Sequence, residues 1–232
     1  MEIISLFIAF VMACLPALLW LTFFLREDEC PEPPRMITQT FIVGALMSGP
    51  AIVLQLLLGK LIGSSASLFI PSIVILAASE ELVKFIGVYA TVRNSGDFDQ
   101  PVDAMIYLVV AGLGFATVEN MFVMSSFYNV SGLLGLVDAG QTLLLRFIGA
   151  TLLHTLASAI IGYFWARGIV KNKEGYFIIV GLFFSVVVHG IFNYLVYIYQ
   201  NVNLLYPSLF LIAISFFVFK DFEDLKHPDI PS

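Results

Sequence analysis

The chain has 232 residues, of which 59% are hydrophobic and 12% are charged, and its formal net charge at pH 7 is −6. Its mean hydropathy of +0.96 excludes an ordinary soluble domain of this size. The 11 basic residues form no basic patch, so nucleic-acid binding is not expected. The composition therefore indicates an integral membrane protein.

Seven apolar stretches follow one another along the chain. They lie at roughly 3–25, 37–58, 66–90, 102–128, 142–166, 176–199 and 204–219. Each is long enough, at about 1.5 Å per residue, to cross a hydrocarbon core of about 30 Å. We expect an all-α polytopic membrane helix bundle of about seven transmembrane helices, with its N-terminus outside and its C-terminus cytoplasmic.

The connecting segments leave no room for a second folded domain. Residues 1–220 should form a single transmembrane domain and residues 221–232 a short cytoplasmic tail. The segments 26–36, with three prolines, and 129–141, rich in glycine, are predicted to be loops. The first apolar stretch opens with Glu2 and is too long for a signal peptide, so we expect it to be retained.

The basic residues predict the orientation in the membrane. Eight of them fall in the first, third and fifth loops and the tail: Arg26, Arg35, Arg93, Arg167, Lys171, Lys173, Lys220 and Lys226. Only Lys60 falls in a loop on the opposite side. Because basic loops are retained in the cytoplasm, this asymmetry gives the stated orientation and predicts a multi-pass protein of the cell membrane.

Ionisable residues stand in the middle of four apolar stretches. They are Glu80 and Glu81, then Glu119, His154 and His189. A charged side chain at the centre of a membrane helix costs about 2.5–3.5 kcal/mol, so such residues are usually functional. At about 1.5 Å per residue, those of the four stretches lie about 13–21 Å from the outer end of their helices. We expect them to converge in one layer below the outer leaflet.

Helical spacing extends this layer along each helix. Lys84 lies four residues after Glu80 and three after Glu81, so it shares a helical face with them. Asn193 lies four residues after His189 and shares a face with it in the same way. A buried ion pair that only stabilises packing is an alternative role for Lys84.

Other polar residues have simpler interpretations. Arg146, near the outer interface, should extend its charge toward the membrane surface. Asn120 and Ser158 are expected to form interhelical hydrogen bonds. Asp103 and Tyr107 should hold the cytoplasmic end of the fourth stretch, and His227 in the polar tail has no expected role in chemistry.

The order and spacing of these residues resemble the motifs of the PrsW family of intramembrane proteases. The motifs are Glu80-Glu81-x-x-Lys84, Phe115-x-x-x-Glu119-Asn120, His154 and His189-x-x-x-Asn193, and Pro33-Pro34-Arg35 and Pro101-x-Asp103 before Tyr107 are also similar to stretches typical of the family. The resemblance spans roughly residues 31–195. In the distantly related CAAX prenyl endopeptidases and bacteriocin-immunity proteins, the first motif ends in Arg and the second in His, where this chain has Lys84 and Glu119.

The resemblance implies hydrolysis of a peptide bond in or near the bilayer. The substrate would be a membrane-anchored protein, since the founding activity of the family is cleavage of a membrane-anchored anti-sigma factor. Hydrolysis needs an activated water, a proton carrier for the leaving amine and a donor for the oxyanion. Glu80 is predicted to be the base and Glu81 its partner, with Lys84 holding one carboxyl group ionised.

The remaining site residues complete this prediction. His189 and Asn193 would donate to the oxyanion from one helical face, and His154 would position water or carry a proton. Glu119 would orient a histidine or share the water.

Three alternatives remain open from the sequence, one of which is a catalytically silent binder or chaperone of membrane segments. A metalloprotease would use His154, His189, Glu119 and Glu80 as an open zinc site that acidifies a bound water. The His-Glu-x-x-His motif is absent from the sequence, so a metal-free, glutamate-type mechanism is favoured. A proton-coupled transporter or channel could use the same layer, although only Gly49-Pro50 suggests the broken helices of such folds.

Overall fold

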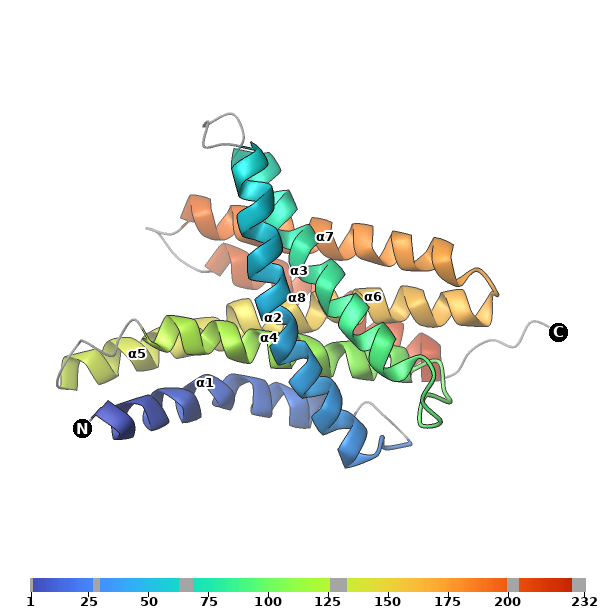
Figure 1. Ribbon diagram of the computed structural model, residues 1–232, viewed down its shortest axis with the longest axis horizontal. Coiled ribbons are helices and arrows are strands. Elements are labelled where there is room, and N and C mark those ends of the chain that lie inside the picture. Colours follow the sequence, from blue (N-terminus) through green and yellow to red (C-terminus); the bar gives the residue numbers. More distant parts are fainter. Residues whose placement is uncertain (1, 27–29, 63–68, 126–132, 200–204, 227–232) are drawn as a thin grey trace.

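The computed structural model describes residues 2–26, 30–62, 69–125, 133–199 and 205–226 (Figure 1). Its helices are α1 (Glu2–Phe24), α2 (Pro34–Ile62), α3 (Phe69–Val92), α4 (Asp103–Ser125), α5 (Leu133–Arg146), the π-helical turn η2 (Phe147–Thr151), α6 (Leu152–Val170), α7 (Glu174–Tyr199) and α8 (Leu205–Lys226). Because α5, η2 and α6 follow one another without a break, the described residues form seven continuous helical segments. The predicted all-α membrane bundle is confirmed.

Five helices in the described part of the chain are long and apolar enough to cross a membrane. They are Pro34–Lys60, Asp103–Ser125, Gly140–Val170, Glu174–Tyr199 and Leu205–Leu225. Helix α3 has 24 residues but carries Glu80, Glu81 and Lys84 near its middle, so its apolar character is interrupted. The chain is therefore a multi-pass membrane protein, and α3 is a largely apolar helix with three charged residues near its middle.

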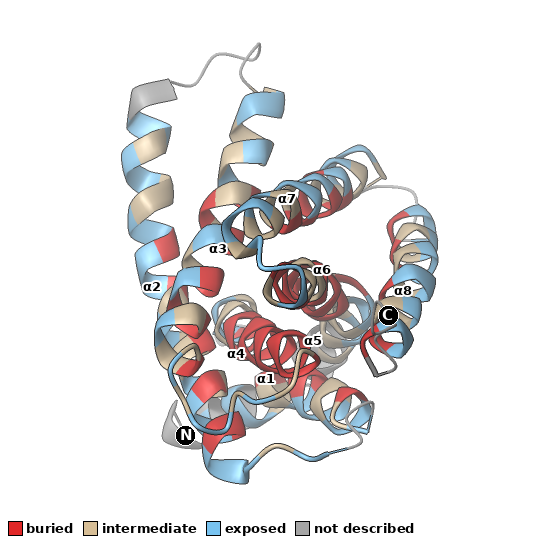
Figure 2. Ribbon diagram, turned by 90° about the vertical axis from the view of Figure 1, so that its right-hand side faces the viewer, coloured by how far each residue is buried: buried red, intermediate tan, exposed pale blue. Residues whose placement is uncertain are grey.

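Helices α4 and α6 form the centre of the bundle, and the other helices surround them (Figure 2). Small residues bring the central backbones close together, as is common between membrane helices. A side-chain carbon added at Gly112 would lie 2.7 Å from the carbonyl oxygen of His154, and one added at Gly162 would lie 2.5 Å from the Cα of Met105. This close contact fixes α6, and with it His154, against α4.

The helices run back and forth between two ends of the bundle. Helix α1 begins at the first end of the bundle (Figure 1). The helices that finish at the second end are α1, α3, α6 and α8, and those that begin there are α2, α4 and α7. The described parts of the first, third and fifth loops and of the tail, which carry most of the basic residues, all lie at this second end. The predicted orientation requires them to share one side of the membrane. Helix α8 continues past Lys220 and buries Phe222, so helical structure includes the first part of the segment predicted to be a tail.

Two local expectations are wrong. Part of the predicted loop 129–141 belongs to α5, which begins at Leu133, and residues 126–132 lie outside the described residues. Helix α2 continues through Pro50 without the interruption that Gly49-Pro50 suggested. In a membrane the backbone must satisfy its own hydrogen bonds, so glycine and proline end helices less readily there than in water.

Candidate active site

A cavity of about 370 Å³ lies in the half of the bundle where α4 and α7 end. Its polar lining residues are Glu80, Glu119, Thr142, Arg146, His154, His189, Asn193 and Ser208, and Leu153, Phe192 and Val196 contribute to its apolar wall. Five of the predicted site residues therefore face one cavity from α3, α4, α6 and α7. Glu81 and Lys84 are fully buried beside it.

Glu81 is the buried acceptor of this site. The ammonium group of Lys84 donates to Glu81 Oε1 at 2.6 Å, and His189 Nδ1 lies 2.7 Å from the same oxygen. Because an ionised carboxylate only accepts hydrogen bonds, His189 Nδ1 carries the proton in this contact. Glu81 thereby fixes the histidine ring, whose Nε2 lies on the side of Glu80.

Glu80 has one carboxylate oxygen held and one free. Gln55 on α2 donates from Nε2 to Glu80 Oε1 at 2.8 Å. Glu80 Oε2 is buried, has no hydrogen-bond partner among the described residues, and lies 3.6 Å from His189 Nε2. A buried oxygen without a partner is unfavourable unless it serves a ligand or a reaction. Glu80 Oε2 is therefore positioned to bind a molecule in the cavity.

The ring of His154 lies between a cation and an anion. Its Nδ1 is 3.1 Å from Lys84 Nζ, and its Nε2 is 2.9 Å from Glu119 Oε2. An ammonium group can only donate, so Nδ1 accepts and the ring proton is on Nε2, which donates to Glu119. Both nitrogens of neutral His154 are thus engaged. The ring packs edge-on against that of His189, with centroids 5.1 Å apart.

Two residues of the site were missed in the sequence. Arg146 does not extend toward the membrane surface, because its Nη2 donates to Glu119 Oε2 at 3.2 Å and its Nε donates to Asn120 Oδ1. Gln55 binds Glu80 across the α2–α3 interface. The available signal was a polar residue in an apolar stretch, but its partner depends on how the helices pack.

Asn120 makes the interhelical hydrogen bonds expected of it. Its Nδ2 donates to Thr151 Oγ1 at 3.2 Å and to the backbone oxygen of Ala13 at 3.4 Å. Ser158 Oγ, in contrast, is buried without a partner among the described residues. Asn120 therefore links α4 to both α1 and the π turn, close to Glu119.

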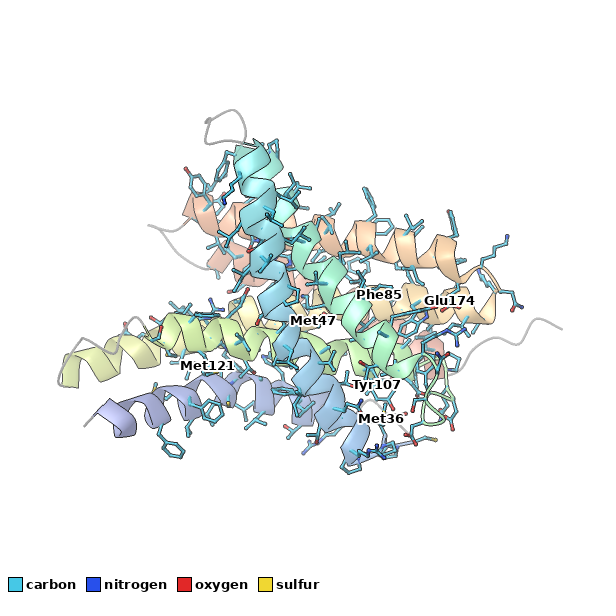
Figure 3. All side chains as sticks on the ribbon, in the orientation of Figure 1. Met36, Met47, Phe85, Tyr107, Met121 and Glu174 are labelled. Carbon is cyan, nitrogen blue, oxygen red and sulfur yellow. The ribbon has the colours of Figure 1, made fainter. Side chains whose placement is uncertain are left out.

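The opposite end of α4 has its own polar network, away from the cavity. Tyr107 lies toward the same end of the bundle as Glu174 (Figure 3), and its hydroxyl donates to the Glu32 carboxylate. Asp103 Oδ2 accepts two backbone N–H groups of the preceding turn, at 2.9 and 2.7 Å. Both residues hold this helix end, as predicted, while His227 lies outside the described residues.

Comparison with known proteins identifies the family. The model of the family described as PrsW family intramembrane metalloprotease matches residues 32–219. The chain belongs to the PrsW family. The Protease PrsW of Geobacillus kaustophilus (strain HTA426) is 26% identical over 196 residues, which cover 83% of this chain and 80% of that protein. The Protease PrsW of Clostridioides difficile (strain 630) is also 26% identical over 196 residues, covering 82% and 79%.

A third PrsW relative matches over a shorter region. The Protease PrsW of Bacillus subtilis (strain 168) is 29% identical over 99 residues, 43% of this chain and 45% of that protein. No solved structure matches the chain. The resemblance drawn from the motifs is confirmed, and the prediction of an intramembrane protease fits these relatives better than a transporter or channel.

Proposed function

We propose that this PrsW-family member is an endopeptidase of the cell membrane that hydrolyses a peptide bond of a membrane-anchored protein, for example an anti-sigma factor. One observation carries the proposal. The buried Oε2 of Glu80, which has no hydrogen-bond partner in the described part of the chain, lies 3.6 Å from Nε2 of His189 at the edge of a cavity that Asn193 also lines. This arrangement provides a base, a second acceptor for water and an amide donor in one place.

Glu80 activates the water. Its Oε2 takes one proton as the water oxygen attacks the carbonyl carbon of the substrate, and it later gives that proton to the leaving amine nitrogen as the C–N bond breaks. The Nδ1–H group of His189 donates a hydrogen bond to Glu81, so the neutral ring keeps a lone pair on Nε2. That lone pair accepts the second hydrogen of the same water and orients it. The carboxylate of Glu80 is regenerated at the end of the cycle.

Asn193 supplies the donor for the oxyanion. It lies one helical turn after His189 and lines the same cavity. An amide N–H group held in a cavity with little water stabilises the negative charge that develops on the carbonyl oxygen. The oxyanion role was predicted for His189 as well. Because the Nδ1–H group of His189 is engaged with Glu81, we propose that His189 binds the water instead.

Glu119 is a fixed anion in this proposal. It accepts from His154 Nε2 and from Arg146, so its carboxylate is already committed to two donors. Of the two roles that the sequence left open for Glu119, orienting a histidine agrees with these bonds. Glu80 is then the carboxylate of the cavity that is free to react.

Only some of the site residues have lone pairs available to bind a metal. Glu80, His154 and His189 each offer one ligand atom within 4.8 Å of the others, which is the two-histidine, one-carboxylate set of many catalytic zinc sites. Glu80 and His189 have lone pairs available for a metal. His154 has none, because Nδ1 accepts from Lys84 and Nε2 carries the proton donated to Glu119. The bonds of His154 therefore favour the metal-free, glutamate-type mechanism.

Purified protein in liposomes with a single-pass membrane substrate tests the proposal. Glu80→Gln keeps the shape of the side chain but removes the base, and we expect cleavage to fall by at least about 100-fold. Asp99→Asn makes the same chemical change at an exposed site outside the cavity and should leave cleavage unchanged. Chelators should also leave cleavage unchanged. Proton flux without cleavage, or full cleavage by Glu80→Gln, would contradict the proposal.

A further inference from the structure

Arg146 makes the least expected contacts of the site. It is the last residue of α5, directly before the π turn Phe147–Thr151. Its side chain is 19% exposed, lines the cavity, and bonds to both Glu119 and Asn120 on α4. Glu119 Oε2 therefore receives two donors from one continuous helix, Arg146 Nη2 at 3.2 Å and His154 Nε2 at 2.9 Å.

The π turn explains how both donors reach the same oxygen. Arg146 precedes His154 by eight residues, and in a regular α-helix such residues are rotated by about 80° and face different neighbours. A π turn accommodates one extra residue, so eight residues span the rotation of seven and the two side chains differ by only about 20°. The turn thus brings a cation onto the face that carries the site histidine.

Neighbouring helices support the turn in this form. Trp20 on α1 donates from Nε1 to the backbone oxygen of Phe147 at 2.9 Å, and the two rings stack with centroids 5.1 Å apart. Asn120 on α4 donates to Thr151 Oγ1 at the other end of the turn. A π turn is less stable than a regular helix and is frequent at functional sites. Here its beginning and its end are both bound from outside.

We infer that Arg146 is a positioning residue of the proteolytic site, which the π turn places so that it holds Glu119 as the acceptor for His154. This inference rests on the proposed function. Without Arg146, the partly exposed carboxylate of Glu119 would lose its counter-ion and could turn toward the water of Glu80. His154 would keep its proton on Nε2, because Lys84 still donates to Nδ1, but that proton would lose its fixed acceptor. The expected consequence is slower chemistry with little change in substrate binding.

Replacement of Arg146 tests the positioning role. We expect Arg146→Met to lower kcat by about 10–100-fold, the usual range for a residue that orients a site group, with KM within about 2-fold of the parent. Arg146→Lys should restore part of the loss, because it keeps the charge. Arg93→Met is the matched control, since it removes an interhelical Arg–Glu pair at the other end of the bundle, Arg93 Nε to Glu174 Oε1 at 3.0 Å, and should leave kcat unchanged.

A double-mutant cycle separates positioning from general support of the fold. If Arg146 acts through Glu119, then Arg146→Met combined with Glu119→Gln should lose no more activity than Glu119→Gln alone. Losses that multiply, or full kcat in Arg146→Met, would overturn the inference. If Arg146→Met fails to fold in a thermal melt, the same cycle is run with Arg146→Lys.

The ring proton of His154 gives a readout that does not depend on proteolysis. Lys84 keeps the ring proton of His154 on Nε2 in both proteins, so the readout is the hydrogen bond of that proton to Glu119. NMR of nitrogen-15 histidine-labelled protein should show the Nε2–H proton at a downfield, hydrogen-bonded shift in the parent and at a less downfield shift in Arg146→Met. An unchanged shift of this Nε2–H proton would contradict the inference even if the protein cleaves no substrate. Absence of cleavage by the parent protein, in contrast, would contradict only the proposed function.

Discussion

Lys84 shows how one residue determines the state of several others. It is fully buried and contacts Glu81 Oε1 at 2.6 Å and His154 Nδ1 at 3.1 Å. An ammonium group has three protons to donate and nothing to accept with, so it sets the ring form of His154 while it neutralises Glu81. The sequence offered a simple ion pair as an alternative role for Lys84. The contact with His154 connects that pair to the cavity.

Lys84→Met should therefore impair both folding and activity. It leaves Glu81 as a buried charge without its cation, which costs about 3–5 kcal/mol of unfolding free energy. Lys84→Met combined with Glu81→Leu removes both charges, so it should recover much of that stability but no activity, because His189 then lacks its acceptor. Reversible unfolding in detergent, measured beside the cleavage assay, checks both expectations. A double variant no more stable than Lys84→Met would contradict this account.

At the scale of the helix, features that follow from the residues of each segment could be predicted from the sequence. Features that depend on hydrogen bonds between helices could not. Ionisable groups in hydrocarbon must find one another, so the meeting of Glu80, Glu119, His154 and His189 was predictable from depth alone. The π turn was not, because Phe147–Thr151 has no sequence signature and is held by bonds from other helices. The contacts of Arg146 depend on that turn and were missed with it.

Changes of length within the π turn should have unequal effects. Deletion of Ala150 leaves Arg146 seven residues before His154 in a regular α-helix, about 20° apart, so both should still reach Glu119. Insertion of one alanine after Ala150 rotates them to about 80° apart if the π turn persists. We expect the deletion to retain more cleavage activity than the insertion. Equal losses in the two variants would show that the rotational alignment of Arg146 with His154 does not determine the cleavage activity.

At the scale of the whole molecule, the cavity has a definite position along the bundle. It lies in the half where α4 and α7 end, and the basic loops lie at the opposite end. With those loops in the cytoplasm, the cavity belongs to the outer half of the membrane. Peptide bonds of a substrate helix at that depth are already hydrogen-bonded, so the helix must unwind locally before cleavage. We expect the cleaved bond to lie in the outer third of the substrate helix.

The native cysteines allow this orientation to be tested. Cys30 is exposed in the first loop, which is predicted to be cytoplasmic, and Cys14 lies within α1. In a Cys14→Ala background, a membrane-impermeant maleimide should label Cys30 only after the cells are permeabilised. Lys60→Cys, in a variant that also carries Cys30→Ala, should be labelled in intact cells. Labelling of Cys30 in intact cells would reverse the orientation, and the proposed cleavage site would then move to the cytoplasmic third of the substrate helix.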